Sequence, residues 1–274
     1  MTNAAAREHT TANDPVTSTR SDGVLRLVMS RPERRNSLSE AMMAALGAAL
    51  ASAAADPAVR VIVIGAEGNV FSAGHDLKEL TAHRGDGDRG RAYFADVMGR
   101  CSRLMEAIVA HPKPVIAEVA GIATAAGCQL VASCDLAVAG EAARFQTPGV
   151  HIGLFCSTPM VALSRAVGRK QALEMLLTGD TLPAHRAAEI GLVNKVVPAS
   201  ELTAATMAFA AKIAAKSPLT IKVGKELFQR QLEAPLADAY RLASEAMVEN
   251  MLARDAEEGI GAFLAKREPH WQGS

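Results

Sequence analysis

The sequence predicts an α/β protein that ends in a helical region. Strand-like and helix-like segments alternate from residue 24 to about residue 140, which indicates right-handed β-α-β crossovers and a core of parallel strands. From residue 200 to residue 267 the chain is almost entirely helix-like. Of its 274 residues, 49% are apolar and only 4% are aromatic. The chain is therefore long enough to bury a large core, and its composition favours close helix packing over an all-β sandwich.

Short patterns mark the first elements. Residues 24–29 are an apolar run that stops at a turn, as expected of a strand. A helix follows over residues 40–55, because Ser39 is a suitable N-cap and Asp56-Pro57 ends the helix. Residues 59–64 are a nearly continuous run of β-branched side chains, which is typical of a strand buried on both faces.

The remaining elements continue this alternation and then lose it. Beyond residue 158 helices dominate, with one short strand among them. We expect further strands at residues 114–119, 136–139 and 192–197, and further helices at residues 91–110, 128–133, 159–167, 170–177 and 184–190.

The chain divides into three parts without a clear linker. The first twenty residues lack an apolar segment and carry both Glu8 and Asp14, so they resemble neither a signal peptide nor a transit peptide. We expect a disordered N-terminal tail over residues 1–21, one α/β body over residues 22–199 and a C-terminal helical region over residues 200–274.

Composition argues against several classes of partner. Lys plus Arg and Asp plus Glu both number 29, so the net charge is zero and no overall positive field attracts a nucleic acid. The longest run of small and apolar residues, 41–55, is shorter than the roughly 20 residues that a membrane span needs.

The four cysteines form no C-x-x-C pair and no cluster with histidine, so we expect no metal site and reduced thiols in a cytoplasmic protein.

One glycine motif raises the question of a nucleotide site. Gly85, Gly87 and Gly90 match G-x-G-x-x-G, but the preceding residues 75–84 are polar rather than strand-like. A dinucleotide fingerprint needs a strand before it and a helix that opens within it. We therefore expect a mobile surface loop here. The sequence also lacks the patterns of P-loops, of H-E-x-x-H zinc proteases and of α/β-hydrolases.

Two segments place glycine-containing turns directly after expected strands. Residues 69–78 follow the strand at 59–64, and residues 121–130 follow the strand at 114–119 and open a helix. Open α/β sheets bind ligands at the carboxyl ends of their strands, and small residues there let backbone N–H groups approach a ligand. The two turns could therefore hold one anionic oxygen between two N–H donors. The same pattern is also expected of two ordinary strand-to-helix turns that bind no ligand, and this alternative stays open.

Four segments together resemble one family. They are R-P-E-R-R-N-S-L from residue 31, F-S-A-G-H-D-L-K from residue 71, A-G-I-A-T-A-A-G-C-Q-L from residue 120 and E-G-I-G-A-F-L-A-K-R from residue 258. These motifs are similar to those of the crotonase superfamily, also called the enoyl-CoA hydratase/isomerase family. The resemblance implies a crotonase-like spiral core of ββα units, a C-terminal helical trimerisation region, and a homotrimer or a dimer of trimers. It also implies an acyl-CoA ligand, with coenzyme A as part of the substrate and no prosthetic group.

The resemblance assigns an oxyanion hole to the backbone N–H groups of His75 and Ala126. These donors would bind the thioester oxygen of an acyl-CoA and stabilise the enolate that forms in the transition state. The family also binds coenzyme A along the first turn and through cations, some of them from a neighbouring subunit. By position, the coenzyme A contacts are Arg34, Ala73, Asp76, Leu77, Lys78, Phe263 and Lys266. For Arg34 and Lys266, ordinary solvated surface charges explain the sequence equally well.

Two departures from the family pattern concern the reaction. Hydratases of this family use two glutamates, and the matching positions here are Gln129 and Gly149. A glutamine amide does not titrate near neutral pH and glycine has no side chain. Neither residue can therefore transfer a proton.

Other groups could replace the two glutamates. Residues 73–76 resemble a methylmalonyl-CoA decarboxylase branch, but the tyrosine of that branch's later loop is missing from residues 155–157. The remaining titratable candidates are Cys156, Glu118 and His151. Three functions stay open: a hydratase-like enzyme of weak or altered activity, another acyl-CoA reaction such as decarboxylation, and an acyl-CoA-binding or regulatory protein without turnover.

Overall fold

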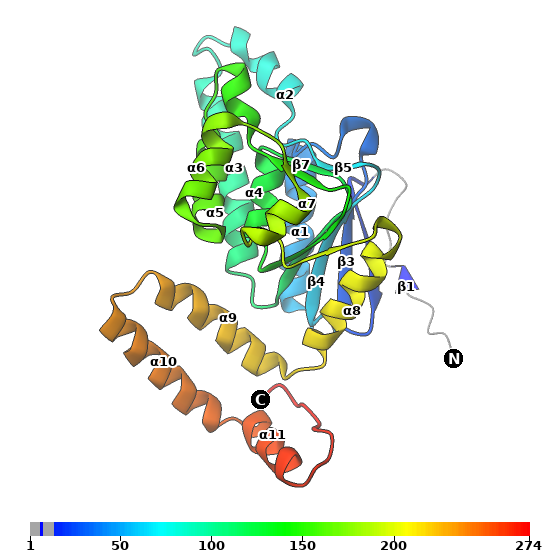
Figure 1. Ribbon diagram of the computed structural model, residues 1–274, viewed down its shortest axis with the longest axis vertical. Helices are drawn as coiled ribbons and strands as arrows, with labels where there is room; N and C mark the ends of the chain where they lie inside the picture. Colours follow the sequence, from blue (N-terminus) through cyan, green and yellow to red (C-terminus); the bar gives the residue numbers. More distant parts are fainter. Residues whose placement is uncertain (1–5, 8–13) are drawn as a thin grey trace.

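The computed structural model describes residues 6–7 and 14–274 and has the predicted α/β architecture (Figure 1). Two sheets and the helices packed against them form a body, and the last helices extend from one end of it. Strands and helices alternate from residue 24 to residue 140, as expected. The predicted α/β class is therefore confirmed.

A seven-stranded sheet forms the centre of the body. In order across the sheet, its strands are β1 (Ala6–Arg7), β2 (Val16–Ser21), β3 (Val24–Met29), β4 (Val61–Ala66), β6 (Val115–Val119), β8 (Leu136–Gly140) and β11 (Lys195–Val197). From β3 onward every strand is parallel to its neighbour, whereas β1 and β2 are antiparallel to theirs. The strands expected from hydropathy are all present, some of them shorter or shifted by two residues.

The strands of a second sheet are not predicted by the local residue patterns, although the family resemblance implies ββα units. Its strands, in order, are β10 (Leu182–Pro183), β9 (Arg144–Gln146), β7 (Ile122–Thr124) and β5 (Val70–Ser72). Two or three residues are too few to show an alternating pattern, which explains the omission. β5, β7 and β9 each follow a long strand of the large sheet after a tight turn and lead toward a helix, so the ββα unit repeats along the chain.

The turn between β6 and β7 requires a glycine. A Cβ atom on Gly121 would lie 2.0 Å from the carbonyl oxygen of Asn69, in the turn between β4 and β5. No other residue allows two backbones to approach this closely. Consecutive ββα units therefore stack through direct backbone contact.

Helices cover both faces of the large sheet. The helices of the body are α1 (Glu40–Ala55), α2 (Leu77–Ala82), α3 (Arg91–Val109), α4 (Ala126–Ser133), α5 (Ser157–Ala166), α6 (Arg169–Thr178), α7 (Ala184–Glu189) and α8 (Leu202–Ala214), with 3-10 turns η1 (Pro32–Arg34), η2 (His83–Gly85), η3 (Pro148–Ile152) and η4 (Ala199–Glu201). The face of the large sheet that carries Leu25, Ile62 and Ile64 packs against α1, α3 and α4, and the opposite face, with Val61 and Val63, packs against α8.

Local signals place several helix ends correctly. Ser39 caps α1, because its side chain accepts a hydrogen bond from the backbone N of Met42. The expected loop with the G-x-G-x-x-G motif contains η2 and the turn before α3, and α2 precedes it as a helix that the sequence does not predict. Asp88 in this turn accepts hydrogen bonds from the backbone N of Gly90 and of Ala92, so it fixes the start of α3. The motif therefore lies at the start of α3 and does not follow a strand.

Strand β2 corrects the predicted N-terminal tail. Residues 16–21 pair with β3 along their whole length, from Val16 opposite Met29 to Ser21 opposite Val24. Their sequence, V-T-S-T-R-S, contains a single strongly apolar side chain, so hydropathy does not reveal a strand that its neighbour's backbone stabilises. The prediction of a disordered tail is therefore wrong for these six residues and for Ala6–Arg7, which form β1 and pair with β2. Residues 1–5 and 8–13 of that tail lie outside the part of the chain that the structure describes.

An ion pair crosses β4 beneath α8. Nη2 of Arg26, on β3, donates to Oε1 of Glu118, on β6, over a distance of 2.6 Å. Gly65 of β4 lies between them, and a Cβ atom there would be 3.3 Å from both partners. Thr203 of α8 donates a further hydrogen bond to the same carboxylate oxygen. Glu118 is thus part of the packing between the sheet and α8.

The last three helices form an arm below the body (Figure 1). They are α9 (Pro218–Leu232), α10 (Leu236–Met251) and α11 (Arg254–Leu264). The side chain of Lys225 on α9 reaches into the body, where Nζ lies 2.7 Å from Oδ2 of Asp135 and also donates to the carbonyls of Ile108 and Lys113. This buried contact anchors the start of the arm.

The end of the chain folds back onto the arm. Asp255, at the start of α11, accepts hydrogen bonds from Oγ of Ser217 at 2.6 Å and from the backbone N of Gln272 at 2.7 Å. The indole N–H of Trp271 donates to the carbonyl of Ala215, just after α8. These contacts fix the orientation of α11 relative to the end of α8.

The arm carries many exposed apolar side chains. Among residues 14–274, large apolar side chains are exposed on each of the three arm helices, α9, α10 and α11. No helix of the described ranges has the length and apolarity needed to cross a bilayer. The exposed apolar side chains are Phe228, Leu232, Leu236, Tyr240, Met247, Val248, Met251, Leu252, Ile260, Phe263 and Leu264.

Candidate active site

Three turns meet at one edge of the small sheet. β5, β7 and β9 are parallel neighbours, so their carboxyl ends lie side by side. The turn after β5 contains residues 73–76, the turn after β7 contains residues 125–126, and the turn after β9 contains residues 147–149. Parallel sheets bind ligands at such ends. The sequence places the first two turns after long strands, but the short strands are what bring all three together.

The first two turns are in direct contact. Gly74 has a φ of +81°, and a Cβ atom there would lie 3.0 Å from Cβ of Ala125 and 3.1 Å from the backbone N of Ala126. A side chain at this position would push the turns apart, so glycine is required both for its conformation and for its size. The Gly74 carbonyl accepts a hydrogen bond from the backbone N of Leu38 at 2.7 Å, which ties the first turn to the segment before α1.

The second turn enters α4 through a strained residue. Ala125 has a φ of 50° and a ψ of −119°, a combination that residues with a side chain rarely adopt. Its N–H donates to the carbonyl of Gln146 on β9, and its own carbonyl accepts from the backbone N of Gln129, both at 3.0 Å. The next N–H, of Ala126, opens α4 and has no carbonyl partner within the helix. This donor lies at the positive end of the helix dipole.

Gln129 is enclosed between α3 and α4. Its side chain is buried, and Oε1 accepts a weak hydrogen bond from the thiol of Cys101 on α3, with a sulfur-to-oxygen distance of 3.9 Å. Burial raises the pKa of the Cys101 thiol to about 11, so the thiol is a proton donor at neutral pH. Neither member of this pair can accept a proton from water.

Gly149 has no room for a larger side chain. It is buried in η3, and a Cβ atom there would lie 2.9 Å from Sγ of Cys156 and 2.9 Å from the carbonyl oxygen of Leu154. Cys156 therefore occupies the space next to the position where the family pattern has a glutamate. Burial raises the pKa of the Cys156 thiol, which is the opposite of the shift that a catalytic thiolate needs.

His75 carries its imidazole into the protein rather than into solvent. Neither ring nitrogen has a hydrogen-bond partner of acceptable geometry among the described residues. Burial lowers the pKa of His75, and the neighbouring backbone of Leu38 opposes that shift only in part. The imidazole is therefore neutral at physiological pH and has one donor and one acceptor nitrogen.

Two further titratable candidates have structural roles. Glu118 lies in the large sheet, where it pairs with Arg26 and accepts from Thr203 beneath α8. His151 is exposed, and its Nε2 lies 2.9 Å from the carbonyl oxygen of Thr178 at the end of α6. Neither side chain belongs to the three turns.

The structure gathers several predicted coenzyme A contacts around the first turn. The Asp76 carboxylate accepts a hydrogen bond from the backbone N of Lys78, caps α2, and lies 3.8 Å from Nη1 of Arg34. The backbone N of Ala73 donates to the carbonyl of Arg35, which follows η1. The side chains of Arg34, Leu77 and Lys78 are exposed beside this turn.

Phe263 and Lys266 are not part of this group. Phe263 belongs to α11 and is 82% exposed, and Lys266 lies just beyond the end of that helix. In Figure 1, α11 is at the opposite end of the molecule from α2, which directly follows the first turn. These two residues therefore do not reach the three turns within one chain.

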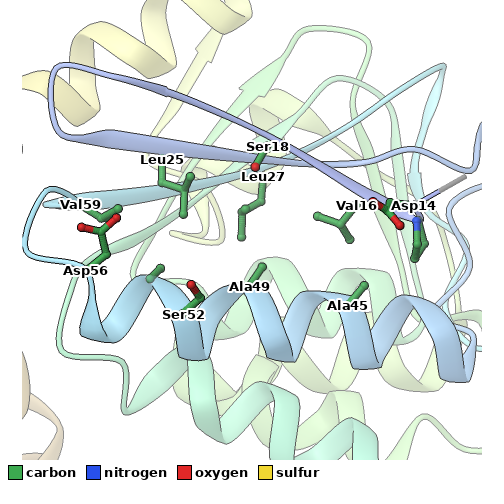
Figure 2. A pocket seen from close by; sticks show the side chains of 12 residues that line it. Asp14, Val16, Ser18, Leu25, Leu27, Ala45, Ala49, Ser52, Asp56 and Val59 are labelled. Carbon is green, nitrogen blue, oxygen red and sulfur yellow. The ribbon is translucent and has the colours of Figure 1, made fainter. Parts of the chain in front are cut away.

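A cavity of about 240 Å³ lies elsewhere in the molecule, between α1 and the strands β2 and β3 (Figure 2). Ala45 and Ala49 on the helix face Val16 and Leu27 on the strands, and the short alanine side chains leave the space unfilled. The cavity contains none of the residues at the three turns. We therefore place the candidate site at the turns rather than in the cavity.

One residue of this region is missed by sequence reasoning. Thr124 ends β7, and its Oγ1 atom is buried without a hydrogen-bond partner in the described part of the protein. In the sequence, Thr124 can be identified by its polar side chain two residues before Ala126, whose N–H is a predicted donor. Across residues 14–274 the structure groups no set of His, Cys, Asp and Glu side chains that could hold a metal ion.

Comparison with known proteins places the chain among relatives of similar length and fold. The sequence model described as enoyl-CoA hydratase/isomerase matches residues 19–274. The human enoyl-CoA hydratase domain-containing protein 3, mitochondrial, is 52% identical over 257 residues, which are 94% of this chain and 83% of that protein. The 2,3-dehydroadipyl-CoA hydratase of Escherichia coli K12 is 35% identical over 93% of this chain and 97% of its own length.

Solved structures give the same result. The crystal structure of the human domain-containing protein 3 superposes with a TM-score of 0.89 and covers 94% of this chain and all of that chain. An enoyl-CoA hydratase from Mycobacterium smegmatis is 49% identical, with a TM-score of 0.89 over 94% of this chain and 98% of its own. The crotonase-like fold expected from the four motifs is thus confirmed. Within that family, the chain is similar to the enoyl-CoA hydratase domain-containing protein 3 branch.

The comparison also corrects the predicted location. Relatives that are 52% identical to this chain are named mitochondrial, so the prediction of a cytoplasmic protein is wrong. The sequence signals for location are the unpaired cysteines and the composition of the N-terminal residues. Unpaired cysteines are typical of reducing compartments but do not distinguish one reducing compartment from another.

Proposed function

The chain belongs to the enoyl-CoA hydratase/isomerase family, and from this premise we propose that it binds an acyl-CoA thioester at the three turns. The thioester oxygen is held between the backbone N–H groups of His75 and Ala126, which stabilise the negative charge of an enolate. Such donors each contribute roughly 3–4 kcal/mol to transition-state stabilisation in other enzymes. Coenzyme A enters as part of the substrate, and the family acts on CoA thioesters without a prosthetic group.

The contact between the first two turns is the observation that carries this proposal. Gly74 lets the turn that contains His75 touch the turn that contains Ala126, and the strained residue Ala125 stands directly before the first N–H of α4. Strained backbone persists where the surroundings hold it, and it is concentrated at functional sites. The Arg34 side chain and residues 73–78 provide cations and backbone for the coenzyme A moiety.

For the reaction, we propose a slow, hydratase-like chemistry. Gln129 orients a water molecule or the thioester through its amide but removes no proton, and Gly149 contributes no side chain. A second candidate function is acyl-CoA binding without turnover, which the absence of both carboxylates favours. Following the loss of enoyl thioester absorbance of crotonyl-CoA separates the two, since protein-dependent hydration above the uncatalysed rate is incompatible with a protein that only binds.

Restoring one carboxylate should accelerate hydration. We expect Gln129→Glu to raise kcat for crotonyl-CoA by about 100-fold or more, because positioned proton transfer contributes ~10²–10⁴-fold. Gln129→Met, of similar size and without a titratable group, is the matched control and should not accelerate the reaction. Adding Gly149→Glu is not useful, because its Cβ atom would collide with Cys156 and Leu154. An unchanged kcat in the Glu variant would show that residue 129 is not at the reacting carbons.

The exposed arm suggests assembly with further copies of the chain. We propose a homotrimer, or a dimer of trimers, in which α11 of one subunit lies over the three turns of a neighbour and contributes Phe263 and Lys266 to the coenzyme A site. The apolar side chains of α9–α11 support this, because large exposed apolar patches mark association surfaces.

Weakening this surface should weaken ligand binding. We expect Phe263→Asp to shift the protein toward smaller species in sedimentation velocity and to raise the Kd for acyl-CoA at least tenfold, because the site loses its neighbour. Gly261→Ala, on the same helix and with open space around it, is the control and should change neither quantity. A wild-type protein that sediments as a monomer at micromolar concentration would contradict the proposed assembly.

A further inference from the structure

Three basic residues come together where the arm joins the body. His111 and Lys113 lie in the segment between α3 and β6, and Lys225 reaches the same segment from α9. His111 is only 4% exposed, and the side chain of Lys225 is 8% exposed. Asp135 supplies the carboxylate that pairs with Lys225. Because buried charges are costly unless they are paired, a further positive charge here would act on the anchor of the arm.

The hydrogen bonds of His111 fix which ring nitrogen carries the proton. Nε2 lies 3.0 Å from the carbonyl oxygen of Leu50 on α1, which can only accept a hydrogen bond, so Nε2 is the donor. The backbone N–H of Lys113 donates to Nδ1 over 3.1 Å, so Nδ1 is the acceptor. A neutral imidazole has one nitrogen of each kind. The neutral ring is therefore fully paired.

Protonation of His111 would disturb this arrangement at Nδ1. A protonated Nδ1 can only donate, so the ring would lose the hydrogen bond from the N–H of Lys113. The carbonyl oxygen of Lys113, 3.1 Å from Nδ1, is an acceptor within its reach. The same oxygen already accepts a hydrogen bond from Nζ of Lys225 at 3.2 Å. The imidazolium and the Lys225 ammonium would therefore both point at one oxygen atom.

The charges that face the ring oppose this protonation. Burial lowers the pKa of His111 below its ordinary value of 6.5, and the hydrogen bonds of the ring to backbone oppose that shift only in part. The positive charges of Lys225 and Lys113 lower the pKa further. The Asp135 carboxylate attracts a charged ring, but Lys225 is already bonded to it at 2.7 Å. A protonated His111 would thus compete with Lys225 for both of its acceptors in this segment.

The remaining charges face Lys113 rather than the ring. Nζ of Lys113 donates to backbone carbonyls at the end of α1, and the charges of Asp56 and Arg60 act on this ammonium with opposite signs. Lysine side chains are charged throughout the range from about pH 8 to about pH 5. Of the three basic residues, His111 is therefore the one that gains charge in this range.

We propose that His111 is a pH-sensitive switch for the arm: when its ring takes up a proton, Nδ1 competes with Lys225 for the Lys113 carbonyl and α9 loosens from the body. Above about pH 6.5 the ring is neutral and the anchor is intact. The anchor weakens as the pH falls below that value, because the released arm leaves a ring that binds the proton more readily. A link to subunit assembly rests on the proposed function of the arm, whereas the switch itself does not.

Hydrogen–deuterium exchange of the whole protein, followed by mass spectrometry, tests the switch. His111→Gln can keep both hydrogen bonds of the neutral ring, since its amide donates and accepts, but it cannot be protonated. At about pH 5.5 we expect α9 peptides to exchange at least fivefold faster in the wild-type protein than in His111→Gln, and at about pH 8 we expect equal rates. Peptides from β4 should exchange alike in both proteins at both pH values.

A matched control and a second measurement accompany this test. His151→Gln removes an exposed histidine whose Nε2 contacts the carbonyl of Thr178, and it should exchange like the wild-type protein. NMR titration of the His111 ring in the wild-type protein and in Lys225→Met measures the coupling directly. Without the ammonium group, the ring should bind a proton at least threefold more tightly. This second measurement does not depend on whether His111→Gln folds.

Three results would overturn the switch. One is equal exchange of α9 in the wild-type protein and in His111→Gln at the acidic pH. Another is acid-induced exchange that accelerates equally in α9 and β4, which would make His111 a group that stabilises the whole body. The third is a proton affinity of His111 that Lys225→Met leaves unchanged. None of these results bears on acyl-CoA binding, which titration of the wild-type protein at neutral pH tests separately.

Discussion

Replacing Gly127 by alanine is expected to abolish acyl-CoA binding and to lower the free energy of unfolding by about 3 kcal/mol. Gly127 lies in the first turn of α4, and a Cβ atom there would be 2.3 Å from the carbonyl oxygen of Ser72 on β5. The obstacle is backbone, so no side-chain rotation can relieve it. The added methyl group must move α4 away from β5 and so separate the N–H of Ala126 from the turn that contains His75.

Urea denaturation and acyl-CoA titration measure the two effects. Gly47→Ala is the matched control, because Gly47 lies in the middle of α1 with nothing within 4 Å of its Cβ position. That change should stabilise the protein by about 0.5–1 kcal/mol through helix propensity and leave binding unaffected. Wild-type affinity in Gly127→Ala would mean that the contact between α4 and β5 is not part of the binding site.

Replacing Lys225 by methionine is expected to cost about 3–5 kcal/mol of stability, because it leaves the Asp135 carboxylate buried without its counter-ion. The side chains of Lys225 and Asp135 are 8% and 17% exposed, and burial raises the pKa of Asp135 while Lys225 opposes that shift. The same carboxylate oxygen accepts a hydrogen bond from the backbone N of Val115 at 2.7 Å. Loss of the Lys225 ammonium group would therefore weaken the attachment of the arm and also disturb the start of β6, which the Asp135 carboxylate holds.

A double-mutant cycle tests the pair. Asp135→Asn should rescue much of the loss in Lys225→Met, since a neutral amide tolerates burial without a counter-ion. Arg165→Met provides the comparison, because Arg165 and Glu233 are 63% and 70% exposed and their ion pair should be worth less than about 1 kcal/mol. Losses of similar size in the two methionine variants would contradict the anchoring role of Lys225.

The parts of the fold that sequence predicts are those with long, regular patterns. The apolar run before Gly65 identifies β4, and the Ser39 cap identifies the start of α1, because burial and capping both leave local signals. The small sheet leaves none, since its strands have two or three residues and are stabilised by their neighbours. The site depends on that sheet. The motifs at residues 69–78 and 121–130 can therefore be recognised in the sequence, whereas the meeting of three turns at one edge cannot.

The side chains of the site show a similar limit. The chemistry of Gln129 follows from its residue type alone, whereas its enclosure beside Cys101 follows only from the packing of α3 on α4. The sequence does not show that Cys156 fills the space next to Gly149, because six residues, which include the end of η3, separate the two in the chain. The unpaired state of His75 and Thr124 likewise depends on burial, which no local pattern encodes.

The order of strands in the large sheet has a consequence for how the chain folds during synthesis. β3, β4, β6, β8 and β11 are added side by side in the order in which the ribosome releases them. Each new strand finds its partner already present, so the loop that must close connects strands that are consecutive in this sheet rather than the two ends of the chain. The Lys225 anchor joins residues 90 positions apart and can form only after the body exists. The arm, with its apolar side chains, is therefore the last part to emerge, when the three turns of the site have already been assembled.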